Sequence, residues 1–415
     1  MTLKPVLHQA IEENLEETVR LYEHFHRNPE LSMQETKTAA TIDEYLTDLG
    51  LQTHWFGGTG IVVEIENGPG PVVAYRADID GLPIQESTGL EYASTARGVL
   101  PDGSETAVMH GCGHDAHIAV GIDIAKQLNQ HRSLWSGTVV MLFQPGEETA
   151  QGARAMLDDG LWDSISRPEA IYGQHVWPGR AGSINVSVGT AMAMADSLEV
   201  TVRGKQAHGS QPENAIDPIV LAAFMITRLQ TIVSREISGQ DMAVVTVGTF
   251  SGGLKDNIIP DSATFQLNIR SFDQDVREHV LSAIHRMIKA EAAASNAPEP
   301  IIREMYQFPQ CVNDETLVNE LIDTFRQELG QDNVNVTPPV TGSEDFGWFG
   351  DDIDVPYVYW FFGGYSEERF DGGSTPPGNH SPFFGPDAVP ELLTTGVRAG
   401  LAALLNHVSK VRTSR

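Results

Sequence analysis

Short apolar runs alternate with stretches of helical periodicity in the N-terminal half, and this alternation constrains the fold more than any other feature. Strands are expected at 61–66, 72–78, 137–144 and 170–176, and helices at 6–27, 35–49, from about 115 and at 151–159. The run 137–144 is continuously apolar, as expected for a central strand that is buried on both faces. Strands that alternate with helices predict an α/β domain with a mostly parallel sheet.

The pattern changes near residue 187. The order from there on is strand, helix, strand, strand, helix, strand, which is the order of a ferredoxin-like α+β domain. We therefore expect an inserted domain at 187–298, while 1–186 and 299–415 form the α/β domain. In the C-terminal part, a helix at 315–329, a strand at 355–363 and a final helix at 387–408 restore the α/β pattern.

Side chains that can bind metal come directly after the expected strands or begin the expected helices. They are Asp78, Cys112, His114, Glu147, Glu148 and His175. Because ligands of such sheets bind beyond the carboxyl ends of the strands, these side chains are expected to converge at one edge. His380 stands at the end of a loop rich in glycine and proline. In such a loop it could also be an ordinary surface histidine.

The segment 108–118, V-M-H-G-C-G-H-D-A-H-I, concentrates metal-binding residue types. Its glycines permit a tight turn in which Cys112 and His114 point at the same ion, and a thiolate at a helix N-terminus is favoured. His117 also has ligand spacing, but we expect His110 and His117 to pack or to form local hydrogen bonds. Mixed Cys, His and Glu ligands suit Zn²⁺, Mn²⁺, Co²⁺ or Ni²⁺. The alternative is a tight turn with solvated histidines.

Two adjacent glutamates, Glu147 and Glu148, come after the central strand and Pro145-Gly146. Neighbouring side chains in a loop point in different directions, so one can bind metal while the other faces a water molecule. A metal that lowers the pKa of water, together with a nearby base, performs metal-assisted hydrolysis. Pairs of glutamates are also common on surfaces, and the strand before this pair favours the catalytic interpretation.

Composition excludes several classes of partner. Of 415 residues, 27 are basic and 56 are acidic, a net charge of −29, and both nucleic acids and anionic membranes require basic surface. The sequence has no apolar run long enough to span a membrane and no secretory pattern near Met1. With only two cysteines, of which Cys112 is a candidate ligand, a reducing cytoplasmic location is expected.

Eight motifs occur in an order that resembles the amidohydrolase branch of the aminoacylase and carboxypeptidase metallopeptidase family. They are R-A-D-I-D-G-L-P, M-H-G-C-G-H-D-A-H, F-Q-P-G-E-E, G-Q-H-V-W-P, G-K-Q-A-H-G-S-Q-P, N-I-I-P-D, G-S-E-D-F and N-H-S-P-F-F. This branch contains hippurate hydrolase, auxin–amino acid conjugate hydrolases and N-acetyldiaminopimelate deacetylase. The chain departs from the usual pattern at Gly81, Gly111 and Gly146, and these departures leave every candidate ligand in place.

The resemblance implies an enzyme with two divalent metals, of which Mn²⁺ and Zn²⁺ are the first choices, that cleaves N-acyl (acetyl or aromatic acyl) L-amino acids. The residues that match metal ligands are Cys112, His114, Glu148, His175 and His380. Glu147 matches the general base, and Asp78 a carboxylate that supports the metal site. His208 matches a lid residue that steadies the oxyanion across a homodimer.

Two other residues of the expected insert, Asn257 and Arg270, match lid positions near the substrate. A histidine, an amide and an arginine on one small domain can bind a carboxylate and an oxyanion. Two alternatives stay open. One is a dipeptidase or carboxypeptidase of the same fold, and the other is a metal-binding relative that has lost catalysis.

Overall fold

The computed structural model describes residues 3–408, which divide into two compact units. Unit 1 contains 3–191, 311–339 and 345–408, and unit 2 contains Met192–Gln310 and Val340–Glu344. The insert thus begins and ends later than the expected 187 and 298. Its end moves because the strand Ile301–Phe308 pairs within the sheet of unit 2 and cannot belong to the other domain.

The eight-stranded sheet of unit 1 has the order β1-β2-β6-β3-β7-β18-β8-β17. These strands are β1 (Thr53–Phe56), β2 (Gly60–Asn67), β6 (Gly137–Gln144), β3 (Val72–Asp78), β7 (Ala170–Arg180), β18 (Tyr357–Tyr365), β8 (Ile184–Val186) and β17 (Val334–Val336). The central strands β6, β3, β7 and β18 are parallel, and β1, β2 and β6 pair antiparallel. This confirms the predicted α/β class with a mostly parallel sheet.

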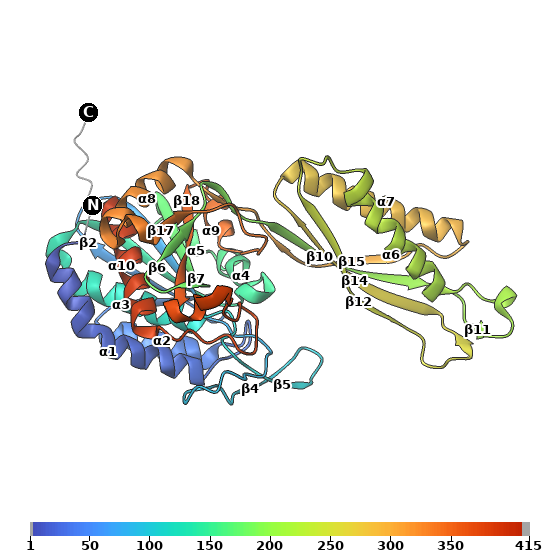
Figure 1. Ribbon diagram of the computed structural model, residues 1–415, viewed down its shortest axis with the longest axis horizontal. Helices are drawn as coiled ribbons and strands as arrows, with labels where there is room; N and C mark the ends of the chain where they lie inside the picture. Colours follow the sequence, from blue (N-terminus) through green and yellow to red (C-terminus); the bar gives the residue numbers. More distant parts are fainter. Residues whose placement is uncertain (1–2, 409–415) are drawn as a thin grey trace. The chain divides into compact units, whose positions relative to one another are not determined.

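Helices α1 (Pro5–Arg27), α3 (His114–Gln130) and α10 (Val389–Val408) pack on one another, and α3 and α10 pack on the parallel strands (Figure 1). The amphipathic α1 buries one stripe that includes Leu7, Ile11 and Phe25. By contrast, α3 and α10 are buried on most sides, which explains their nearly continuous apolar sequence. The other helices of unit 1 are α2 (Thr36–Asp48), α4 (Gly152–Asp158), α5 (Leu161–Ser164), α8 (Glu315–Leu329) and α9 (Gly347–Asp351).

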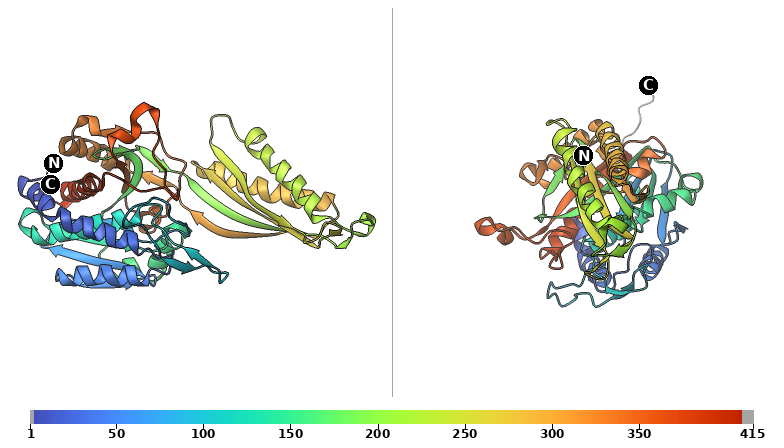
Figure 2. Two further views of the ribbon diagram at one scale, coloured as in Figure 1. Left: turned by 60° about the horizontal axis from the view of Figure 1, so that its bottom comes forward. Right: turned by 90° about the vertical axis from the view of Figure 1, so that its right-hand side faces the viewer.

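Unit 2 has its own hydrophobic core and the predicted ferredoxin-like order of elements. The elements are β10 (Met194–Arg203), α6 (Pro218–Arg235), β12 (Ala243–Gly252), β14 (Ser262–Ser271), α7 (Gln274–Ala294) and β15 (Ile301–Phe308). The antiparallel sheet has the order β12-β14-β10-β15, and α6 and α7 lie side by side on one of its faces (Figure 2). Alternate residues of β14 are buried under these helices.

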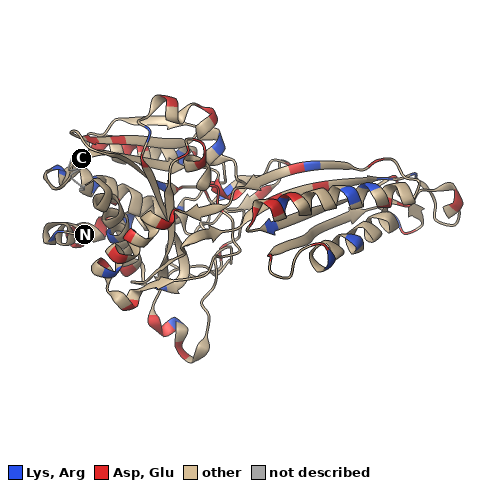
Figure 3. Cartoon of the chain, turned by 90° about the horizontal axis from the view of Figure 1, so that it is seen from above, with Lys and Arg blue, Asp and Glu red and all other residues tan. Residues whose placement is uncertain are grey.

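Several short elements had no counterpart in the sequence analysis. Among them are the hairpin β4 (Arg97–Val99) and β5 (Glu105–Ala107), the pair β9 (Gly189–Met192) and β16 (Cys311–Asn313), and the short strands β1, β8 and β17. Acidic residues are spread along the chain in both units (Figure 3). Among residues 3–408, no helix combines the length and the apolar character that crossing a lipid bilayer requires.

Candidate metal centre

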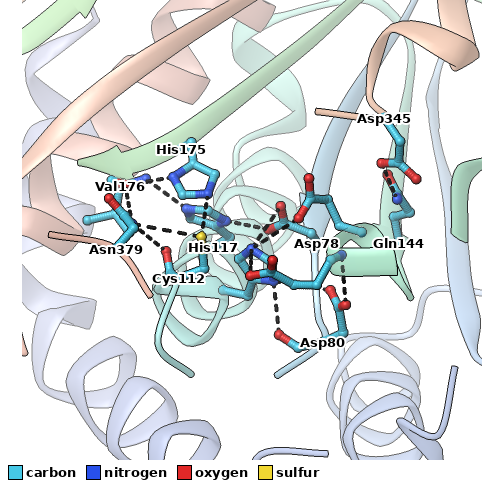
Figure 4. A network of polar contacts seen from close by, with 12 residues as sticks. Asp78, Asp80, Cys112, His117, Gln144, His175, Val176, Asp345 and Asn379 are labelled. Carbon is cyan, nitrogen blue, oxygen red and sulfur yellow. Dashed lines mark hydrogen bonds and ion pairs between the residues drawn. The ribbon is translucent and has the colours of Figure 1, made fainter. Parts of the chain in front are cut away.

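The predicted donor residues of unit 1 converge beyond the parallel strands. Figure 4 shows three of them, Asp78, Cys112 and His175. Asp78 ends β3, and Glu147 and Glu148 come after β6 in the short 3₁₀ turn Glu147–Thr149. His175 lies within β7, not at its end, because β7 continues to Arg180 along β18. The pairing of β7 with β3 stops at Gly173, so His175 lies just past that stretch.

The glycine-flanked turn before α3 brings Cys112 next to the strand that carries His175. Gly113 has φ +88°, and a Cβ there would lie 2.1 Å from Val176 Cγ1, so only glycine fits. The Cys112 Sγ lies 3.4 Å from His175 Nε2. Asn379 Nδ2 donates to the carbonyl oxygens of Cys112, at 3.0 Å, and Val176, at 3.3 Å, and so joins the two segments.

Two histidines have one ring nitrogen fixed by a backbone oxygen and the other directed at the cluster. His114 Nδ1 lies 2.9 Å from the Asp80 carbonyl oxygen, and His175 Nδ1 lies 2.6 Å from the Val176 carbonyl oxygen. If each Nδ1 carries the proton, each Nε2 is left with a free lone pair. This arrangement orients histidines that bind metals.

The loop residue His380 reaches the same place. Its Nε2 lies 3.3 Å from Glu148 Oε2, and its backbone N–H donates to the Gly111 carbonyl oxygen at 2.7 Å. Its φ of +66° is left-handed, which is strained for a residue other than glycine. Strained backbone of this kind is concentrated at functional sites, where the surroundings hold it.

Three overlapping groups of donor atoms contain the predicted ligands, and within each group the atoms lie within 4.8 Å of one another. The groups are Asp78, His114, His117 and His175; Cys112, Glu148 and His380; and His114, Glu147 and Glu148. The five residues predicted as ligands are therefore brought together, with Glu147 beside them. Within residues 3–408, His114 Nε2 and Glu148 Oε1 are buried without a hydrogen-bond partner. Because such atoms are costly to bury unless something satisfies them, this donor set fits divalent cations.

The charges point to the same conclusion. Burial raises the pKa of the Cys112 thiol well above its usual range, and the charges of Glu148 and Glu147 raise it further. Burial alone would lower the pKa of His114, but Asp78 and Asp80 raise it to about 10. Bound cations would favour the thiolate and the neutral imidazole, the forms that bind metals.

Asp78 belongs to the first of these groups, and its Oδ2 lies 3.4 Å from His114 Nε2. Its Oδ2 accepts from the buried Arg76 Nη1 at 2.6 Å, and its Oδ1 contacts His117 Nδ1. The Val176 N–H donates to His117 Nε2 at 2.8 Å, so both ring nitrogens of His117 are used locally, as expected. His110 is buried and packs in the turn, but neither of its ring nitrogens is hydrogen-bonded to a described residue.

Sequence reasoning missed the part played by Asp80. Its side chain accepts from the Glu148 backbone N–H at 3.1 Å and from Ser32 Oγ at 2.6 Å, and its Oδ1 lies 3.1 Å from His114 Nδ1. The motif D-I-D contained the signal, since its second carboxylate also lies just past the strand. Asn379 opens the motif N-H-S-P-F-F beside His380, but sequence reasoning gave it no role.

The three residues predicted to contact substrate from the insert all belong to unit 2. His208 is exposed in the short strand β11 (Ala207–His208), where its Nδ1 lies 2.8 Å from Ser210 Oγ. Asn257 is close to it, since the Gly209 N–H donates to the Asn257 carbonyl oxygen. Arg270 lies in β14 and donates to the Thr341 carbonyl oxygen at 2.7 Å. Their contacts with substrate stay predictions.

Known proteins match this chain over most of its length. The profile of Peptidase family M20/M25/M40 matches residues 74–401. N-acetylcysteine deacetylase of Bacillus subtilis (strain 168) is 37% identical over 338 residues, 80% of this chain and 85% of that protein. Hippurate hydrolase of Campylobacter jejuni subsp. jejuni is 34% identical over 338 residues, with the same two coverages. The YXEP protein of Bacillus subtilis, described as a dinuclear metal binding peptidase, is 30% identical with a TM-score of 0.74, covering 96% of this chain and 99% of that one.

The fold, the donor cluster and these matches define a metal-dependent hydrolase that acts on amides. The chain belongs to peptidase family M20/M25/M40, and its relatives are those of the amidohydrolase branch. The resemblance drawn from the eight motifs is thereby confirmed.

Proposed function

We propose that this enzyme hydrolyses the amide bond of N-acyl L-amino acids, with acetyl or aromatic acyl groups, using two divalent metal ions per subunit. The observation that carries the proposal is the cluster of donors in which His114 Nε2 and Glu148 Oε1 are buried with no hydrogen-bond partner among residues 3–408. Relatives named for acetyl and benzoyl amino acids support the substrate class. We assign Mn²⁺ or Zn²⁺ as the metal, with Co²⁺ and Ni²⁺ as alternatives, because thiolate, imidazole and carboxylate donors suit these ions.

In this proposal Cys112, His114, Glu148, His175 and His380 hold the metals, which supply Lewis acidity and lower the pKa of water. Glu147 stands beside the ligands, with its Oε2 3.9 Å from His114 Nε2. From there its carboxylate takes the proton of the attacking water and delivers it to the leaving amine. Asp78 supports the site through Arg76 and His117.

Unit 2 contributes the remaining groups in the proposal. His208 would steady the oxyanion by donating a hydrogen bond, and Asn257 and Arg270 would contact the substrate. A homodimer formed through unit 2 is supported by apolar side chains that a monomer leaves in water. On α6, Val220 and Phe224 stand one turn apart and are 51% and 61% exposed. The neighbouring β12 is an edge strand that carries the exposed Phe250 near its C-terminal end.

The proposed base is tested by Glu147→Gln, with Glu148→Gln as its companion. We expect Glu147→Gln to keep its metal and to lose roughly 10²–10⁴-fold in kcat, because a positioned base contributes that much. Glu148→Gln should instead lose metal, which elemental analysis after dialysis measures. Near-normal turnover of a metal-loaded Glu147→Gln enzyme would sink the assignment.

The substrate class is tested by a panel of N-acetyl, N-benzoyl and dipeptide substrates with enzyme reconstituted in each of the four metals. Cleavage of the acylated amino acids in preference to dipeptides is the expected result. A preference for dipeptides would favour the dipeptidase or carboxypeptidase alternative, and a metal-loaded protein inactive on every amide would favour the catalytically silent one. Light scattering of wild type and Phe224→Glu tests the dimer, since the variant should be monomeric.

A further inference from the structure

The connection between α1 and α2 lies against two loops of the candidate metal centre. The Gly81 N–H donates to the Glu30 carbonyl oxygen at 2.7 Å, and Ser32 Oγ donates to Asp80 Oδ2 at 2.6 Å. Both contacts fix the turn after β3, whose Asp80 contacts His114 and Glu148. This connection lies outside residues 74–401, which match the family profile, so the profile gives no role to its residues.

At the end of this connection, Glu35 has 0% of its surface exposed, and both of its carboxylate oxygens accept hydrogen bonds. Oε1 accepts from the Met33 N–H at 2.7 Å and from the Gly146 N–H at 2.9 Å. Oε2 accepts from Thr59 Oγ1 at 2.7 Å. One side chain therefore joins the connection, the loop before β2 and the loop that carries Glu147.

Gly146 sets the path of the loop that carries Glu147. It has φ +56°, and a Cβ there would lie 2.4 Å from Met33 Sδ, so the loop passes tightly over the connection. Its carbonyl oxygen accepts from the N–H groups of Gln151 and Gly152 at the start of α4. The next residue is Glu147. Without the Glu35 acceptor, the buried Gly146 N–H would lose its partner and the loop would shift to find another.

We propose that Glu35 is a positioning residue that holds the loop of Glu147 and Glu148 in its working place through the Gly146 N–H. The proposal rests on the proposed role of Glu147 as the general base. Positioning affects rate strongly, because a displacement of about 1 Å at a reacting group can reduce turnover about 10²-fold.

Glu35 acts through the reach and the acceptor atoms of its side chain, not through its charge. A glutamine has the same length, can accept from Met33 and Gly146 through its oxygen, and can donate to Thr59 through its amide. An aspartate keeps the charge but is one methylene too short to reach all three partners. Burial and the nearby Asp80 raise the pKa of Glu35 to about 7, so a neutral side chain at this position is tolerated.

The experiment compares kcat and KM of metal-loaded wild type, Glu35→Gln, Glu35→Asp and Glu35→Ala. We expect Glu35→Gln within about 3-fold of wild type, and the Asp and Ala variants to lose about 10–100-fold in kcat with little change in KM. The matched control is Glu30→Ala. The Glu30 side chain accepts from Lys37 and Thr38 at the start of α2, so its loss should lower the melting temperature but leave kcat unchanged.

A second measurement does not depend on turnover. In protein loaded with Co²⁺, the visible absorption reports the ligand geometry, and Glu148 moves with the loop. Glu35→Asp should change this spectrum, whereas Glu35→Gln and Glu30→Ala should match wild type. If wild type cleaves no substrate of the panel, the proposed function fails and the spectra alone decide the role of Glu35.

Three outcomes would overturn the proposal. They are full kcat and an unchanged spectrum in Glu35→Asp, a Glu35→Gln variant as impaired as Glu35→Asp, and an equal loss of kcat in Glu30→Ala. If Glu35→Ala does not fold, the contrast between Gln and Asp still decides.

Discussion

A buried histidine that contacts the first turn of α3 makes the free energy of unfolding of unit 1 depend on pH in a way that can be calculated. His26, near the end of α1, is 1% exposed. Its Nδ1 lies 2.7 Å from Asp115 Oδ2 in the first turn of α3, and its Nε2 lies 3.1 Å from Glu86 Oε1. Only the imidazolium can donate to both carboxylates at once, so we expect His26 to be charged at neutral pH.

Burial alone would lower the pKa of His26, but the hydrogen bonds to Asp115 and Glu86 outweigh it and raise the pKa to about 9. In the unfolded chain the pKa returns to about 6.5. Because its pKa is higher in the folded state, protonated His26 stabilises the folded protein fully below about pH 6.5. This stabilisation is lost as the pH rises through about 9. The shift corresponds to about 3 kcal/mol, of which about half is lost by pH 8. The pKa values of both carboxyl groups are lowered, so they stay ionised across this window.

The assay is urea unfolding of metal-saturated wild type and His26→Gln at about pH 6.5, 8 and 9.5. All six tryptophans lie in unit 1, so their fluorescence reports on the unit that contains His26. The stability difference between the two proteins should shrink by about 3 kcal/mol from the lowest to the highest pH. Subtraction removes other titrating groups, such as Glu35. The control is His24→Gln, an exposed histidine two residues earlier on the same helix. A difference that does not vary with pH would refute the reasoning.

Three further outcomes concern the site. Gly113→Ala places a Cβ 2.1 Å from Val176 Cγ1, so the variant should lose on the order of 1–3 kcal/mol of stability and part of its metal. The control is Gly103→Ala, since Gly103 has a similar φ but open space around it. Comparing the thermal unfolding of the two variants separates the clash from the backbone strain. Cys112→Ser should bind less than two metals per subunit after dialysis, and full occupancy would remove Cys112 from the ligand set. Arg76→Met strands the buried carboxylates that Arg76 pairs with, so urea unfolding should show a loss of about 3–5 kcal/mol, and an unchanged midpoint would contradict this.

The predicted elements agree with the structure because their signals are local. The run 137–144 is apolar throughout and forms β6 with those bounds, and the helix expected at 315–329 forms α8. Asp78, Glu147 and Glu148 were singled out for a related reason: they lie at or just after the ends of buried strands, and the carboxyl ends of parallel strands meet at one edge of the sheet. His175 shows the limit of this logic, since β7 runs on past it along β18. Pairing between distant segments sets where a strand ends, and no local pattern records it.

The residues that hold the ligands in place could not be found in the same way, because their roles exist only in the folded chain. Glu35 contacts Gly146, which is more than a hundred residues away in the sequence. Its local sequence does not distinguish it from any other glutamate at the start of a helix. Burial distinguishes it, since a carboxylate that leaves water must find donors, and here the donors are backbone N–H groups of the turns it joins. Asp80 obeys the same rule with His114 and the Glu148 N–H. Buried carboxylates that hold turns are therefore the features to seek in a structure once the sequence has supplied candidate ligands.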